Sequence, residues 1–141
     1  MKHLWDYGVN DRIPEREWCP SAQQLRQYAE ASGDFNPIHL DEDYARKAGL
    51  GGVIAHGMLT MAQVGAMLTD WLAMEGELKN FDVRFQGMVR IGERLKCSGY
   101  IKDKDGNDLI CDLKVTSEEG EKKLAGSAVV SLKTEDSKTA I

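Results

Sequence analysis

The feature that most constrains the fold is an apolar segment of helical periodicity near the middle of the chain, from Gly57 to about Met74. Large apolar side chains recur at helical spacing along it, at Met61, Val64, Leu68, Trp71 and Leu72. Small residues occupy the opposite side, and a helix of this kind is buried on most of its faces. Polar residues interrupt the segment, which is wrong for a membrane span. The sequence therefore predicts one long helix buried inside the protein.

After Gly76 the sequence changes from a helical to a strand pattern. Residues 81–85 alternate between apolar and charged side chains, which is the period of a strand. Three further extended segments follow, at roughly 94–103, 108–116 and 123–133, separated by two good hairpin turns. Wrapping this antiparallel meander around the long helix is the simplest way to bury both. We expect an α+β fold in which residues 1–141 form a single domain.

Two shorter helices are predicted ahead of the long one. Ser21 is an N-cap candidate with Gln24 three residues on, a capping-box pattern, and Gly33 is a plausible stop. A second helix is expected from Asp41 to Ala48, because the acidic residues at its start complement the helix dipole.

The two ends of the chain carry weaker signals. Residues 1–20 contain the breakers Pro14 and Pro20 and are expected to be irregular or weakly extended. The C-terminal run TEDSKTAI is polar and is expected to fray.

Composition argues against several classes of function. A net charge of −5 disfavours bulk electrostatic binding to nucleic acid or to an anionic membrane. The three cysteines, Cys19, Cys97 and Cys111, lie far apart and show no CxxC or Cys/His spacing. A metal site and a disulfide framework are therefore not expected. No apolar stretch at the start is long enough for a signal peptide, so we expect free thiols in a reducing cytoplasm.

The densest group of polar residues lies between the first two predicted helices, at Ser32-Gly33-Asp34-Phe35-Asn36-Pro37-Ile38-His39. Glycine and proline give this loop a fixed, sharply turned backbone. The carboxylate of Asp34 and the imidazole of His39 can converge there on one small molecule, such as a water, and exchange protons with it. Asn36 could hold a substrate carbonyl or fix the loop. Each of these residues is also common in ordinary turns, and composition alone favours that interpretation.

A second signal, Gly51-Gly52-Val53-Ile54-Ala55-His56-Gly57, leads into the long helix. Free N–H groups at a helix N-terminus, beside a glycine that permits close approach, suit an oxygen that gains negative charge. The alternative is that these glycines only allow a tight entry into a crowded core. His56 is expected to cap or pack there in a structural role.

Together these motifs resemble those of a known family. The run Tyr-Ala-Glu-Ala-Ser-Gly-Asp-Phe-Asn-Pro-Ile-His at 28–39, followed by Ala-His-Gly-Met at 55–58, is similar to the MaoC-like, (R)-specific enoyl-thioester hydratase/dehydratase family of the hot-dog fold. The resemblance covers residues 21 to about 75 well, and beyond that it rests on the strand meander and on residues 80–85. It implies that Asp34 and His39 hold the catalytic water and that the Gly57 N–H forms the oxyanion contact.

The reaction implied by the resemblance is reversible syn hydration of a trans-2-enoyl thioester to an (R)-3-hydroxyacyl thioester. It needs no redox cofactor and no metal, because the thioester already acidifies the α-position. Our working assignment makes Asp34 the main base toward water, with His39 binding that water and sharing the proton transfer. Asn36 is carried over only as a supporting residue.

The implied substrate is an acyl thioester of coenzyme A or of acyl carrier protein. Arg84 could meet a phosphate of either carrier, and Met58 could contact the acyl chain. A solvated strand face and a core position are the commoner explanations for these two residues. A sheet of this size leaves an edge strand that a second copy could cover. We therefore expect a homodimer, or the catalytic half of a heterodimer with a related hot-dog subunit.

Two other functions remain open from the sequence. A hot-dog thioesterase would hydrolyse the thioester, usually with an acidic residue of the central helix. Asp70 is the only carboxylate within that helix and lies near its far end from Gly57, which argues against this alternative. The second is a non-catalytic acyl-thioester-binding subunit, for which an intact pair of Asp34 and His39 would be unusual.

Overall fold

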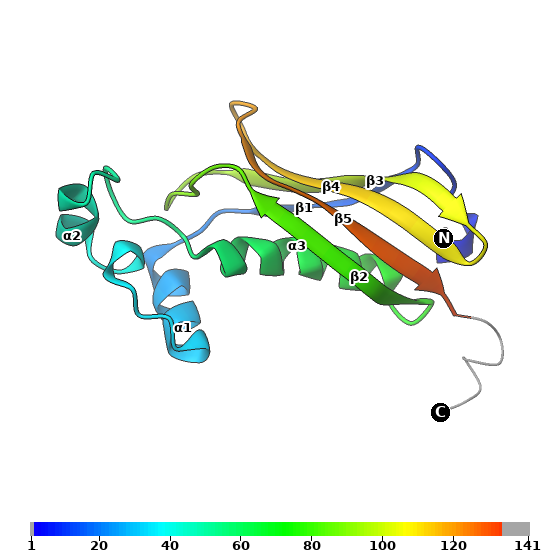
Figure 1. Ribbon diagram of the computed structural model, residues 1–141, viewed down its shortest axis with the longest axis horizontal. Coiled ribbons are helices and arrows are strands. Elements are labelled where there is room, and N and C mark those ends of the chain that lie inside the picture. Colours follow the sequence, from blue (N-terminus) through cyan, green and yellow to red (C-terminus); the bar gives the residue numbers. More distant parts are fainter. Residues whose placement is uncertain (1, 134–141) are drawn as a thin grey trace.

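The computed structural model describes residues 2–133. Its helices are the 3-10 turns η1 (Leu4–Asp6) and η2 (Pro37–His39) and the α-helices α1 (Ala22–Ser32), α2 (Glu42–Lys47) and α3 (Gly57–Leu72). Its strands are β1 (Arg12–Trp18), β2 (Gly76–Phe85), β3 (Leu95–Asp105), β4 (Asp108–Ser117) and β5 (Lys122–Leu132). Helix α3 runs along one face of the sheet, and α1 and α2 lie beyond one end of it (Figure 1). The α+β arrangement predicted from the sequence is therefore confirmed.

The five strands form one antiparallel sheet in the order β1-β3-β4-β5-β2. Strands β3, β4 and β5 form the expected meander. Strand β2 differs from the expectation, because it pairs with β5 and not with β3, the strand that follows it in the chain. Segment 86–94 connects β2 to β3 and pairs on its way with residues 53–55, through a bridge between Ile54 and Arg90.

Strand β1 was not predicted, since residues 1–20 were expected to be irregular or weakly extended. It pairs with β3 at one edge of the sheet, and its register shifts between Ile13 and Arg16. Pro14 lies within that shift, and proline is tolerated on an edge strand because its missing N–H removes no bond to a further strand. Ile13 and Trp18 are buried, and they anchor the strand to the core.

Helix α3 buries one broad face against the sheet. The buried residues of this face are Leu59, Thr60, Gln63, Val64, Met67, Leu68 and Leu72. At Gly65 a Cβ would lie 3.6 Å from the ring of Phe81, an ordinary packing distance, so β2 packs on α3 without requiring glycine there. Met58, Ala62 and Thr69 remain exposed, so the predicted burial on most faces is incomplete in the single chain. Within residues 2–133, no helix has the length and apolar character needed to cross a membrane.

The ends of α1 confirm two local predictions and correct a third. The Gln24 N–H donates to Ser21 Oγ at 3.1 Å, and Gly33 ends the helix in the left-handed conformation at φ 78°. The return half of the capping box is absent, because Gln24 Oε1 accepts the indole N–H of Trp18 at 2.7 Å. The predicted fraying of residues 134–141 lies outside the described residues.

Candidate active site

The loop between α1 and α2 is shaped by a series of side-chain acceptors, each of which binds the backbone two residues on. Ser32 Oγ accepts the Asp34 N–H, Asp34 Oδ1 accepts the Asn36 N–H, and Asn36 Oδ1 accepts the Ile38 N–H, each at 3.2 Å. Short polar side chains favour such turns over helix or strand. The turn interpretation of Asp34 and Asn36 is therefore correct, and it leaves Asp34 Oδ2 free of the turn.

The fixed loop brings Asp34 and His39 together. Asp34 Oδ2 lies 4.0 Å from His39 Nε2, and the Asp34 side chain is 49% exposed. The other ring nitrogen, Nδ1, lies 2.7 Å from the carbonyl oxygen of Ile54. A carbonyl only accepts, so Nδ1 carries the hydrogen, and the neutral ring then presents a basic lone pair at Nε2. In that form of the ring, the two groups predicted to form an acid–base pair face each other as two acceptors.

His56 contacts both members of this pair, the backbone of Asp34 and the ring of His39. Its side chain is 2% exposed, and Nε2 donates to the backbone oxygen of Asp34 at 3.1 Å. Its ring stacks on His39, with centroids 3.9 Å apart and planes inclined by 28°, and Tyr28 packs on it at 4.7 Å. Burial lowers the pKa of His56 below the ordinary 6.5, and the nearby His39 lowers it further. The hydrogen bond to the Asp34 carbonyl and the Asp34 charge offset part of this lowering of the pKa.

Gly57 opens α3 directly after His56. Within the described part of the chain its N–H has no protein acceptor, as expected for the first turn of a helix. A Cβ at this position would lie 3.2 Å from the ring of Phe85, so any other residue would require that ring to move by a few tenths of an ångström. Glycine therefore lets Phe85 pack against the start of α3.

Asp34, His39 and His56 each offer one ligand atom within 4.8 Å of the others, so a metal site must be considered. The ring geometry argues against one. The lone pairs of an imidazole lie in its plane, and two rings stacked 3.9 Å apart do not direct them at one point. The bonds of His39 Nδ1 and His56 Nε2 to backbone carbonyls do not bear on this question, because metal-bound histidines commonly make the same bond through their other nitrogen. The arrangement suits proton exchange with a small molecule better than metal coordination.

The other predicted site residues divide into two groups. Asn36 and Met58 lie beside the pair, Asn36 in the loop itself and Met58 exposed next to Gly57. Arg84 is not brought to this place. Phe85 faces Gly57, and successive residues of a strand point to opposite faces, so Arg84 lies on the other face of β2.

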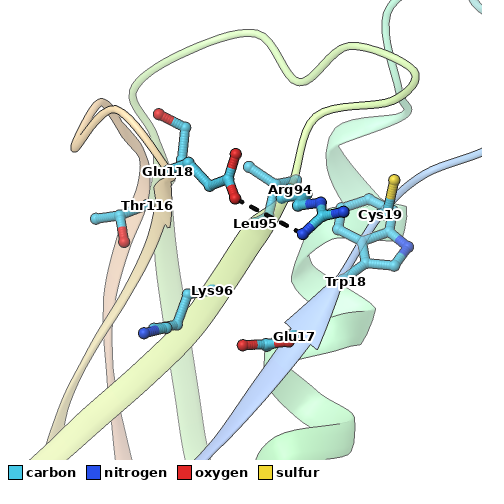
Figure 2. Close-up of a pocket in the computed structure, with 9 residues that line it drawn as sticks. Glu17, Trp18, Cys19, Arg94, Leu95, Lys96, Thr116 and Glu118 are labelled. Atoms are coloured by element: carbon cyan, nitrogen blue, oxygen red, sulfur yellow. Dashed lines mark ion pairs between the residues drawn. The ribbon is translucent and has the colours of Figure 1, made fainter.

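A separate pocket of about 590 Å³ lies where β1, β3 and β4 come together, and it contains none of the predicted site residues (Figure 2). Its charges are of both signs, with Arg94 3.9 Å from Glu118 and Lys96 3.7 Å from Glu15. Cys19 and Trp18 lie at one side of it. Because its cations already have acidic partners, the pocket shows no preference for a phosphate or another anion.

Comparison with known proteins supports the assignment that the geometry suggests. A family model described as MaoC like domain matches residues 10–123, which is most of the chain. The chain belongs to the MaoC-like hydratase/dehydratase family. Among solved structures, the unliganded R-hydratase PhaJ1 of Pseudomonas aeruginosa superimposes with a TM-score of 0.86 at 26% identity, over 93% of this chain and 85% of that one. The fold is accordingly the hot-dog fold, and the family supports a hydro-lyase in general terms.

Two further relatives of this MaoC-like protein bear on its setting. The fatty acid synthase subunit beta of Gibberella zeae is 41% identical over 82 residues, which are 57% of this chain and only 4% of that protein. This chain thus spans a small part of the length of the curated relatives that it matches. The ChsH1-ChsH2 complex from Mycobacterium tuberculosis has a TM-score of 0.81 at 18% identity, over 89% of this chain and 98% of that one, which shows the fold alone.

Proposed function

We propose that this MaoC-like domain catalyses the reversible syn hydration of a trans-2-enoyl thioester to an (R)-3-hydroxyacyl thioester. The observation that carries the proposal is the pair of acceptors, Asp34 Oδ2 and His39 Nε2, 4.0 Å apart. The family and the R-hydratase neighbour favour the same reaction class. The match to a fatty acid synthase subunit favours a fatty acyl thioester.

The separation of the two acceptors suits one shared water. Each hydrogen bond to a water needs about 2.8 Å, so a single oxygen can lie within reach of two atoms 4.0 Å apart. A water held there donates one hydrogen to Asp34 and the other to His39. Its oxygen lone pairs then remain free to attack a β-carbon brought next to them.

In the proposed step a bond forms between the water oxygen and Cβ while the Cα–Cβ π bond breaks. The electron pair moves through Cα to the thioester carbonyl oxygen, and the open Gly57 N–H stabilises the charge that develops there. The proton lost by water is held on Asp34, the main base, with His39 sharing the transfer. It then passes to Cα on the same face of the substrate. Protons balance within the pair, whose two groups titrate together.

We also propose that a second subunit completes the site, in a homodimer or in a heterodimer with a related hot-dog chain. Phe35, Met58 and Phe85 are all exposed large apolar residues, and each is next to or in contact with Asp34 or Gly57. Such residues suit contact with an acyl chain or with a partner's surface. Among the described residues β2 is an edge strand, and a copy could pair with its outer side.

The three free cysteines fit the reducing cytoplasm that the sequence suggests.

The thioesterase alternative gains nothing from the position of Asp70. Its side chain is 76% exposed and lies 3.6 Å from the guanidinium of Arg16, near the end of α3 opposite Gly57. It therefore shares neither the helix N-terminus nor the neighbourhood of His39.

The deciding experiment is an absorbance assay of purified protein with crotonyl-CoA near neutral pH, with a free-thiol assay in parallel. We expect loss of the conjugated enoyl thioester without thiol release, and chiral analysis should give the (R) product. Thiol release without hydration would establish the thioesterase instead. If both assays stay silent with crotonyl-CoA, longer enoyl-CoA chains and enoyl carrier proteins are tested, also with added hot-dog subunits. Binding without turnover in all of them would leave only the non-catalytic subunit.

A further inference from the structure

Lys123, the second residue of β5, is a charged side chain inside the protein. Its side chain is only 4% exposed, although lysine is almost never fully buried unless it is paired. Three oxygens surround Nζ: the Met88 backbone oxygen at 2.7 Å, Glu93 Oε2 at 3.2 Å and Glu121 Oε2 at 3.3 Å. An ammonium group has three N–H donors, so every donor has an oxygen within reach.

Two of these three oxygens belong to segment 86–93, the first part of the connection between β2 and β3. Met88 supplies its backbone carbonyl and Glu93 its carboxylate. The other carboxylate oxygen of Glu93, Oε1, accepts the Arg90 N–H at 2.7 Å. Lys123 and Glu93 together therefore close this segment into a compact loop and attach it to the start of β5.

The loop is in turn bonded to residues 54 and 55, which lie next to the site. The Ala55 N–H donates to the Val89 oxygen at 2.7 Å, and Ile54 forms an antiparallel bridge with Arg90. The backbone of Ile54 also bonds to the loop that carries His39. Its carbonyl accepts His39 Nδ1–H at 2.7 Å, and its N–H donates to the Ile38 oxygen at 3.1 Å. Residues 54 and 55 therefore lie between the loop held by Lys123 and the ring of His39, and they lead directly to the Gly57 N–H.

We propose that Lys123, acting with Glu93, is a positioning residue that fixes His39 Nε2 relative to the Gly57 N–H. Neither residue touches the acid–base pair, and both act through segment 86–93 and residues 54 and 55. A displacement of about 1 Å in a catalytic arrangement is enough to lower a rate by about a hundredfold. The inference rests on the proposed hydration reaction, in which His39 binds the water and the Gly57 N–H binds the thioester oxygen of the same substrate.

The test compares Lys123→Met with a matched control, Lys122→Met, at the exposed neighbouring position. The methionine at 123 keeps the unbranched side chain and loses all three donors. For Lys123→Met we expect kcat of hydration to fall about tenfold or more, with KM within about threefold of wild type, at a temperature where circular dichroism shows the variant folded. Lys122→Met should keep both constants. Glu93→Gln provides a milder variant, because its amide oxygen still accepts the Arg90 N–H, and about a threefold fall in kcat is expected.

Amide hydrogen exchange supplies a second measurement that does not depend on turnover. In Lys123→Met the Ala55 amide should exchange at least about tenfold faster, while the amides of β4 keep their protection. An inactive wild-type protein would overturn the hydratase proposal, and the exchange result would still decide the positioning effect. The positioning role of Lys123 would be overturned by a wild-type kcat in folded Lys123→Met. Equal loss of protection at Ala55 and in β4 would overturn it as well. Should Lys123→Met not fold, Glu93→Gln is judged by the same two measurements.

Discussion

Two regions border residues 53–55, and they are held in place by different means. The proposed catalytic loop, residues 32–39, is shaped by three side-chain acceptors that each bind the backbone two residues away. Segment 86–93, on the other edge, is held by Lys123 from a position 35 residues after Met88. The shape of loop 32–39 is set by residues within the loop itself, while the position of segment 86–93 depends on β5, which follows it in the chain. The proposed reacting groups therefore come from local sequence, and their position relative to the Gly57 N–H depends on contacts across the sheet.

This difference gives the two regions different sensitivities. Changes in the proposed catalytic loop remove the proposed reacting groups or the turns that hold them. Changes around Lys123 remove no reacting group and act only through geometry. A graded set of substitutions separates the two effects.

The largest effect is expected where the reacting groups themselves are removed. Asp34→Asn and His39→Gln should each lower kcat by on the order of a hundredfold or more, because each takes away one proton acceptor from the shared water. Kinetics of enoyl thioester hydration measure this, and circular dichroism should show an unchanged fold. Asp70→Asn, at the far end of α3, is the matched control and should remain active. A near-normal rate in either site variant would remove that residue from the mechanism.

An intermediate effect is expected at His56, which contacts loop 32–39 at two points, the Asp34 carbonyl and the His39 ring. His56→Phe keeps a ring to stack on His39 but loses the donor to the Asp34 carbonyl, whose hydrogen bond is 3.1 Å long. A lost hydrogen bond of this kind is worth about 1 kcal/mol, so kcat should fall between about threefold and tenfold. His56→Gln, which keeps a donor but loses the stacked ring, distinguishes the two contacts. If the phenylalanine variant were fully active, the hydrogen bond to Asp34 would be irrelevant to alignment.

The sequence was informative where contacts are local. Ser21, Gly33 and Asp34 were recognised because each acts on the backbone within a few residues of itself. The amphipathic patterns also located α3 and the meander of β3, β4 and β5. The expectation of irregular or weakly extended chain missed β1 as a strand, because Pro14 argues locally against one and the pairing with β3 is made by residues far along the chain. Sequence spacing also could not place β2 beside β5.

The same reasoning explains which parts of the candidate site were found. Asp34 and His39 share one rigid loop, so their meeting was predictable from their spacing. Lys123 at the start of a strand reads as a solvated charge, because its three oxygens come from positions that only the folded sheet brings together. Arg84 shows the opposite case, because it was predicted to contact the substrate and lies on the other face of β2. The face of a sheet to which a strand residue points is set by the strand register, which depends on tertiary structure.

The lowered pKa of the buried His56 predicts a pH dependence of stability. Burial lowers its pKa in the fold from the ordinary 6.5, so the unfolded chain takes up a proton more readily than the native protein. Its contribution to the free energy of unfolding is therefore fully present above pH 6.5 and is lost as the pH falls below that value. Urea unfolding at several values between about pH 5 and pH 8 measures it. His56→Phe should flatten this part of the profile, and an identical slope in the variant would contradict the assignment.

The smallest effect is expected at Ser32, whose Oγ supplies one of the three turn contacts of the catalytic loop. Ser32→Ala should lower kcat by less than about threefold, because the bonds from Asp34 and Asn36 still shape the loop. Ser21→Ala is its counterpart, since that serine caps α1 and lies outside the loop. It should lower the free energy of unfolding by about 1 kcal/mol and leave kcat unchanged. Thermal unfolding and hydration kinetics, measured on both variants, separate the two. If Ser21→Ala lowered kcat as much as Ser32→Ala does, the loop would not be locally held, and the contrast with segment 86–93 would fail.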